Sequence, residues 1–149
     1  DVYKRQTRYI DLAVSEGAVR SGGAQLDRAT PGFYLEPALL TETVNSDTIN
    51  REEVFGPVAS VVKVADYDEA LAVVNDTEFG LTAGIVTDSL ATATHFKKHA
   101  RAGMVMVNLP TAGVDFHVPF GGLGGSSYGP REQGSAARDF YTTSKTTYT

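Results

Sequence analysis

From Val58 onward, strand-like and helix-like runs alternate, and this alternation constrains the fold more than any other feature of the sequence. Three runs have strand character: Val58 to Val64, Leu81 to Val86 and Met104 to Asn108. The first is β-branched without strict alternation, which predicts a strand covered on both faces. A β-α-β-α-β order predicts an α/β fold with a parallel sheet in three layers. Right-handed crossovers would then align the ends of these strands along one edge.

Two helices are expected between these strands. Asp66-Tyr-Asp-Glu69 resembles a capping box, and an apolar helix face follows it to about Asn75. Asp88 is expected to cap the second helix, which runs to about Arg101 and stops before Gly103.

The flanking segments are less regular. Tyr9 to Glu16 is helical, and Gly17 is expected at its C′ position. Upstream of Val58 we also expect a brief strand at 18–20, an extended segment at 33–40 restricted by Pro37, and a loop or single turn at 45–51. After Asn108 the expected elements are a loop to residue 128, a short helix within 131–141 and a final strand at 142–148.

Composition excludes several functional classes. With 149 residues, of which 42% are hydrophobic, the chain is long enough for one core. Its net charge of −5 comes without a basic patch, which argues against nucleic acid or an anionic membrane as the main partner. No run approaches the about 20 apolar residues of a membrane span, and no signal peptide is evident. The absence of cysteine excludes disulfides and thiolate metal sites, and a cytoplasmic setting is the expectation.

The stretch from Arg51 to Pro57 carries the densest chemistry. A carboxylate (Glu53) and an aromatic ring (Phe55) precede a Gly-Pro pair, and this pair has few backbone conformations available. Such a turn can hydrogen-bond a diol and press on a flat ring at the same time. The alternative is a surface Glu and a core Phe at an ordinary strand entry.

This stretch, Glu-Glu-Val-Phe-Gly-Pro, resembles the Glu-x-Phe-Gly-Pro signature of the aldehyde dehydrogenase superfamily. Further blocks match in order and separation: Gly103 to Asn108, His117 to Gly122 and Gly129 to Glu132. The resemblance covers the chain from about Tyr9 to its end. It is strongest to the branch that oxidises α-ketoglutaric semialdehyde (2,5-dioxovalerate), because 108–113 and 126–134 are similar to that branch. Since family members are several times longer, the resemblance implies a C-terminal fragment.

The resemblance assigns roles to four residues. Glu53 would accept hydrogen bonds from the nicotinamide ribose, and Phe55 would help to hold the nicotinamide ring of NAD or NADP. Asn108 and Phe120 would line the aldehyde pocket, although Asn108 could instead bond its own backbone at a turn. The nucleophilic Cys, the general-base Glu and the residues that choose between NAD and NADP are implied upstream. The fragment alone is therefore expected to be inactive.

Other motifs are less convincing. Gly121 to Gly125 is not read as a phosphate cradle, because it follows no strand directly and does not match G-x-G-x-x-G. The family usually has Lys where Gly124 stands, which leaves that contact in doubt. His95 and His99, spaced i, i+4, are interpreted as a solvated helix face rather than a metal site. His117 receives no proton-transfer role.

Three segments are predicted. Residues 1–6 resemble a translated transposase sequencing adapter and are predicted to be non-native. Residues 7–141 would be a partial catalytic domain, and 142–149 an extended strand through which the full-length protein forms homo-oligomers. The alternative functions are a non-catalytic α/β assembly or binding module, or an unrelated α/β binding domain whose motif match is accidental.

Overall fold

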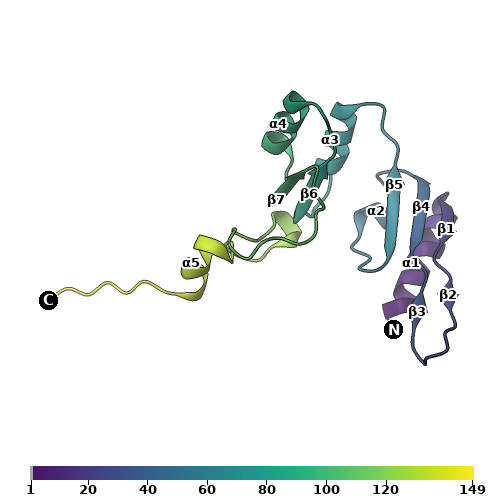
Figure 1. Cartoon of the computed structure of the whole chain (residues 1–149), viewed down its shortest axis with the longest axis horizontal. Coiled ribbons are helices and arrows are strands. Elements are labelled where there is room, and N and C mark those ends of the chain that lie inside the picture. Colours follow the sequence, from purple (N-terminus) through teal and green to yellow (C-terminus); the bar gives the residue numbers. More distant parts are fainter. Residues whose placement is uncertain (1) are drawn as a thin grey trace. The chain divides into compact units, whose positions relative to one another are not determined.

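The computed structural model describes residues 2 to 149, which divide after Ala65 into two compact units. Figure 1 labels the helices and strands of both units. Asp1, the first residue of the segment predicted to be non-native, lies outside the described residues, whereas the rest of that segment belongs to the first helix. Among the described residues, no helix combines the length and apolar character that crossing a bilayer requires.

The first unit packs one long helix on a small mixed sheet. Helix α1 (Val2–Glu16) contacts two of the three strands of the sheet, β1 (Val19–Gly22) and β4 (Ala38–Thr43). In Figure 1, β4 lies between antiparallel β1 and parallel β5 (Val58–Val62). The smaller elements are the paired strands β2 (Gln25–Leu26) and β3 (Tyr34–Leu35) and the single-turn helix α2 (Thr48–Arg51).

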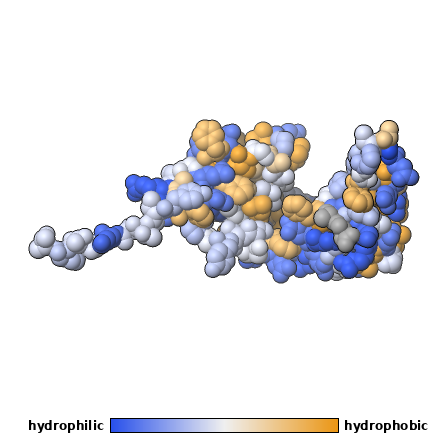
Figure 2. Space-filling view, turned by 90° about the horizontal axis from the view of Figure 1, so that it is seen from below, coloured by the Kyte–Doolittle hydropathy of each residue, from blue (hydrophilic) through white to orange (hydrophobic). Residues whose placement is uncertain are grey.

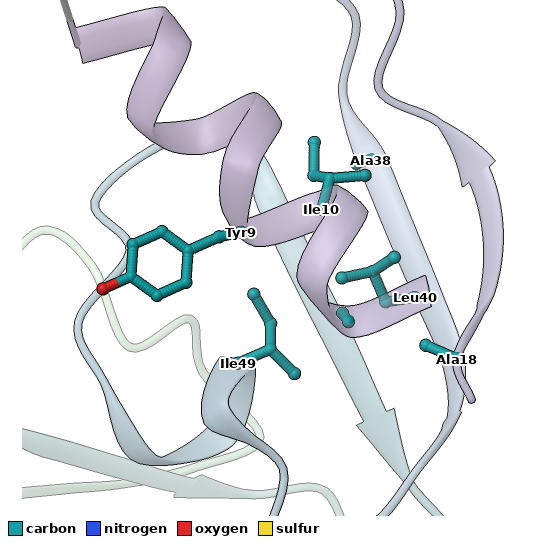
Figure 3. Packing of buried hydrophobic residues seen from close by; sticks show 7 residues of the cluster. Tyr9, Ile10, Ala18, Ala38, Leu40 and Ile49 are labelled. Atoms are coloured by element: carbon teal, nitrogen blue, oxygen red, sulfur yellow. The ribbon is translucent and has the colours of Figure 1, made fainter. Parts of the chain in front are cut away.

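A hydrophobic cluster between α1, α2 and the sheet forms the core of this unit (Figure 3). Ile10 and Leu40 are fully buried at its centre, and each such burial contributes about 1.5–3 kcal/mol. The other members are Tyr9, Ala13, Ala18, Ala38 and Ile49, with Val54 and Val58 partly buried against them.

Gly17 ends α1 as the sequence predicts. It has a φ of 117°, its N–H donates to the Val14 carbonyl, and the Ala18 N–H donates to the Ala13 carbonyl at 2.9 Å. These two bonds form a Schellman motif, which satisfies carbonyls that the end of the helix leaves unpaired.

The second unit begins with the predicted alternation. Helix α3 (Tyr67–Asn75), strand β6 (Thr82–Ile85), helix α4 (Leu90–His99) and strand β7 (Met104–Val107) follow one another, and β6 and β7 pair in parallel. The Asp66 carboxylate accepts from the Glu69 N–H at 2.9 Å, which confirms the predicted cap of α3. Helix α4 contacts β7, and Ala83, Ala93, Phe96 and Met104 are buried.

The chain then runs through a long loop with little regular structure. It contains two short 3-10 helices, η1 (Gly124–Ser126) and η2 (Gly134–Ala136), and it ends in helix α5 (Ala137–Tyr141). Residues 142–149 are exposed and pair with no strand of the described chain. Figure 2 shows this segment as a narrow projection of mostly intermediate and hydrophilic residues. The predicted final strand is therefore extended chain here, since it has no neighbour to pair with.

The α/β fold class with parallel strand pairs is confirmed, but three details were predicted wrongly. Strand β5 pairs with β4 in the sheet of the first unit and shares no sheet with β6 and β7, so the three strands of the predicted alternation do not form one sheet. The three middle residues of β5 are also exposed, so this strand is not covered on both faces. The N-cap of α4 is Ser89 rather than Asp88, because the Ser89 hydroxyl accepts from the Thr92 N–H at 3.2 Å. Helix α4 ends at His99, within two residues of the predicted end near Arg101.

Candidate functional site

The segment between α2 and β5 presents Glu53 and Phe55 to solvent. Both side chains are exposed, Phe55 to 77%, whereas Val54 between them packs partly against the core. Phe55 has a φ of 56°, a left-handed conformation that is rare for a bulky residue. The alternative of a core phenylalanine at this position is therefore wrong, because burying Val54 turns its two neighbours outward.

Backbone contacts hold this segment in place. The Phe55 carbonyl accepts from the Gln6 side-chain amide at 2.7 Å, and the Glu53 carbonyl accepts from the Arg5 guanidinium. The Pro57 carbonyl accepts from the Ala38 N–H at 2.8 Å, which joins the end of the turn to β4. Outward-facing carboxylate and aromatic groups on a backbone held at several points can bind a ligand that carries hydroxyls and a flat ring.

Asn108 ends β7 and joins it to the end of β6. Its side-chain amide donates to the Thr87 carbonyl and accepts from the Thr87 N–H, both at 2.9 Å, while its own N–H donates to the Ile85 carbonyl at 2.8 Å. A φ of 55° turns the chain at this residue. Ligands of parallel α/β sheets bind beyond the carboxyl ends of the strands, so Asn108 lies at the edge where such sites occur. Its place in an aldehyde pocket stays a prediction.

Phe120 is half-buried and lies where the long loop pairs with a later segment. Its N–H donates to the Glu132 carbonyl at 2.6 Å, and its carbonyl accepts from the Glu132 N–H at 2.9 Å. A pocket role for Phe120 also stays a prediction.

Glycines beside Phe120 permit very close packing. A Cβ on Gly103 would lie 1.9 Å from the Gly121 carbonyl oxygen, and one on Gly124 would lie 2.4 Å from that of Glu78. Gly121 and Gly122 are buried. These glycines therefore allow tight packing of the loop.

The four predicted site residues fall into two pairs. Glu53 and Phe55 share one turn of the first unit, whereas Asn108 and Phe120 belong to the second unit.

Two features were not anticipated from the sequence. One is a cavity of about 220 Å³ in the second unit, lined by Asn75, Thr77, Glu78, Phe79, Arg101, Leu123 and Gly124. The other is the role of α1 in holding the 52–57 turn, through contacts between residues more than 40 positions apart. Such long-range contacts leave no local sequence signal.

His95 and His99 lie on one face of α4 with their rings stacked at 4.2 Å. The Tyr67 hydroxyl and His95 Nδ1 share a hydrogen bond of 2.8 Å. Within residues 2–149, no group of three or more His, Cys, Asp or Glu side chains could hold a metal ion.

Comparison with known proteins supports the motif assignment. A family model described as the aldehyde dehydrogenase family matches residues 1–147. An α-ketoglutarate semialdehyde dehydrogenase of Haloferax volcanii is 48% identical over 144 residues, which cover 94% of this chain and 30% of that protein. An α-ketoglutaric semialdehyde dehydrogenase of Bacillus subtilis is 41% identical over 143 residues, covering 94% and 29%.

Solved structures give the same result. An indole-3-acetaldehyde dehydrogenase of P. syringae, solved with NAD+ and IAA, superposes with a TM-score of 0.89 at 36% identity, covering 95% of this chain and 28% of that one. The aldehyde dehydrogenase KauB of Pseudomonas aeruginosa also superposes with a TM-score of 0.89, at 38% identity and the same coverage. The chain thus spans less than a third of the length of these relatives.

Proposed function

The chain belongs to the aldehyde dehydrogenase family, and from this premise we propose that it is the C-terminal part of an NAD(P)-dependent enzyme that oxidises an aldehyde to a carboxylic acid. The observation that carries the proposal is the turn at 52–57, which exposes Glu53 and a conformationally strained Phe55 side by side. Strained backbone of this kind is concentrated at ligand-binding sites.

The exposed groups of this turn fit the sugar and ring of a nicotinamide cofactor. The Glu53 carboxylate can accept hydrogen bonds from two ribose hydroxyls. Charge-assisted bonds of this kind would both bind the ribose and fix its orientation. The Phe55 ring is free to contact the nicotinamide, since 77% of its surface is exposed. When bound, NAD(P) supplies the hydride acceptor. Misplacing the reacting carbon by about 1 Å costs on the order of a hundredfold in rate, so these two side chains matter through positioning.

Asn108 and Phe120 would form part of the aldehyde pocket. The amide of Asn108 fixes the sheet edge from which the loop departs, and the Phe120 ring offers apolar surface on that loop. The chain has no cysteine, so the thiol nucleophile must come from outside these residues. The general-base Glu is proposed to lie upstream as well, as the family resemblance implies. The chain alone therefore catalyses nothing.

The proposed substrate is α-ketoglutaric semialdehyde, oxidised to 2-oxoglutarate. This proposal is supported by the names of three relatives. The two α-ketoglutarate semialdehyde dehydrogenases described above are 48% and 41% identical to this chain, and a 2,5-dioxopentanoate dehydrogenase of Saccharolobus solfataricus is 35% identical. A betaine aldehyde dehydrogenase of Brucella anthropi is 39% identical, so betaine aldehyde is the competing substrate. We further propose a cytoplasmic location, which the absence of cysteine favours.

A chimaera tests the proposal. Residues 7–149 would replace the corresponding segment of the B. subtilis relative, and NADH or NADPH formation would be followed with both aldehydes. We expect the chimaera to oxidise both aldehydes, with a higher kcat/KM for α-ketoglutaric semialdehyde than for betaine aldehyde. A Glu53→Gln variant of the chimaera should have a raised KM for the cofactor. Glu42→Gln is the matched control, because Glu42 is another exposed carboxylate of the same unit and pairs with the surface Lys63.

Two results would contradict the proposal. One is a folded chimaera whose Glu53→Gln variant has unchanged cofactor kinetics. The other is turnover above background by the isolated 149-residue chain mixed with aldehyde and cofactor.

An assembly role is the second candidate, favoured by the exposed segment 142–149, which pairs with no strand of the described chain. An extended segment with free backbone groups can add to the sheet of another chain. Within the first proposal, this segment would join copies of the full-length enzyme as a homo-oligomer. Sedimentation of the isolated chain separates the two candidates, since a defined oligomer favours the module and a monomer or heterogeneous aggregate does not.

A further inference from the structure

Side chains of α1 form hydrogen bonds with the turn that carries Glu53 and Phe55. Within residues 52–55, Glu52, Glu53 and Phe55 are exposed, and Val54 packs partly against the core. The exposed Glu52 carboxylate is nevertheless bonded to Tyr9 of α1. The direction of the Glu53 and Phe55 side chains thus depends on how firmly Glu52 and Val54 are fixed.

Tyr9 makes the contact with Glu52. Its ring is only 6% exposed and belongs to the hydrophobic cluster, and its hydroxyl donates a hydrogen bond to the Glu52 carboxylate. Figure 3 shows the Tyr9 hydroxyl directed away from Ile10 and Leu40. A hydroxyl on a rigid, buried ring is a fixed donor, and its bond to a carboxylate is stronger than a neutral one. Tyr9 therefore connects the packed core directly to the residue that precedes Glu53.

The backbone of the turn needs such support. Phe55 has a φ of 56°, and a bulky residue keeps this conformation only where its surroundings impose it. A Cβ on Gly56 would lie 2.3 Å from Gln6 Nε2, so the Gln6 side chain would have to move to admit one. The Phe55 carbonyl is bound by the same Gln6 amide. Contacts with α1 thus restrain both ends of the short segment that contains Glu53 and Phe55.

We propose that Tyr9 is a positioning residue for the cofactor: through Glu52 it fixes the backbone that aims Glu53 and Phe55. This inference rests on the proposed function of that turn. Tyr9 is preferred over Arg5 and Gln6 because these two lie in the segment predicted to be non-native. Of these three side chains, Tyr9 is the one that the natural protein is proposed to share.

Hydrogen exchange on the isolated chain tests the restraint without reference to catalysis. Tyr9→Phe removes only the hydroxyl, so the core keeps its ring. We expect the amides of Val58, bonded to the Gly56 carbonyl, and Ala38, bonded to the Pro57 carbonyl, to exchange on the order of tenfold faster. Tyr34→Phe is the matched control, because the Tyr34 hydroxyl bonds to Thr30, which lies outside the turn. Unchanged exchange at Val58 and Ala38 in Tyr9→Phe would overturn the inference.

Kinetics of the chimaera test the consequence for the cofactor. Tyr9→Phe should raise the KM for NAD(P) and lower kcat, with the KM for aldehyde unchanged. Glu52→Gln is an exposed substitution that leaves the core intact, and it should also raise the KM for NAD(P) and lower kcat. It provides a second test of the contact if the Tyr9→Phe variant does not fold. The double variant should be no worse than Tyr9→Phe alone, because Glu52→Gln only weakens the contact that Tyr9→Phe removes. Additive effects, or a uniform loss of activity with a lowered Tm, would contradict positioning.

The two ideas fail differently. If Glu53→Gln leaves cofactor kinetics unchanged, the proposed function is wrong whatever Tyr9 does. If Glu53→Gln impairs cofactor binding and both Tyr9→Phe and Glu52→Gln leave it unchanged, only the positioning role is wrong.

Discussion

Replacing Gly103 with Ala should destabilise the second unit, because the added methyl group has no space. The new Cβ would lie 1.9 Å from the Gly121 carbonyl oxygen and 2.3 Å from Arg131 Nη1. Real Cβ atoms essentially never approach closer than 3.0 Å, so the neighbours must move by about 1.1 Å, the difference between 3.0 and 1.9 Å. The Arg131 side chain can turn aside, but the Gly121 oxygen is backbone of a buried residue.

Two opposing terms set the magnitude. Overpacking of this kind typically costs about 1–3 kcal/mol. Ala also lowers the conformational entropy of the unfolded chain. Where the native φ suits Ala, this effect stabilises the folded state by about 0.4–1 kcal/mol and offsets part of the steric cost. The steric term is larger, so the free energy of unfolding of the second unit should fall by about 1–2 kcal/mol.

Urea denaturation of the 149-residue chain measures this change, with amide signals of β6 and β7 reporting on the second unit. Gly125→Ala is the control, because the atom nearest to its added methyl group, the Glu78 carbonyl oxygen, would lie at an ordinary 3.5 Å. The control should stay within about 0.5 kcal/mol of the parent. A Gly103→Ala chain as stable as the Gly125→Ala chain would refute the steric reasoning.

Three further predictions concern local features. Ser89→Ala should lower the free energy of unfolding by about 1 kcal/mol in urea titrations, whereas Asp88→Ala should leave it nearly unchanged, because Ser89 makes the cap bond. Phe55→Gly should raise the free energy of unfolding of the chain by up to about 1 kcal/mol, because glycine adopts a positive φ without strain. The same substitution should impair cofactor binding by the chimaera. A lower free energy of unfolding would show that Phe55 is not strained. Deleting residues 142–149 should leave the free energy of unfolding unchanged but lower the oligomeric state of the chimaera in sedimentation, and an unchanged state would remove their assembly role.

Local patterns allowed much of the fold to be predicted. The cap of α3 and the end of α1 at Gly17 depend on residues within one helical turn, so the sequence shows both. The cap of α4 was misplaced because Asp88 and Ser89 are adjacent and both suit the position. Only the backbone decides which of them carries the extended φ and ψ.

The site was harder to predict in detail. Sequence motifs pointed to Glu53 and Phe55, but nothing local indicates that a phenylalanine adopts a φ of 56°. The contact between Tyr9 and Glu52 joins residues 43 positions apart, so no periodicity reveals it. Exposure of the middle of β5 was also missed, because an apolar run indicates a strand without indicating how many of its faces are covered.

The amide of Asn108 has a consequence for redesign. Because it fastens the end of β7 to the backbone of Thr87, the long loop leaves the sheet from an anchored point. Residues 109–119 can then be lengthened, shortened or exchanged between relatives while the strands beneath keep their register. Within the proposed function, grafting this one stretch would be the way to change which aldehyde the full-length enzyme accepts while the framework is kept.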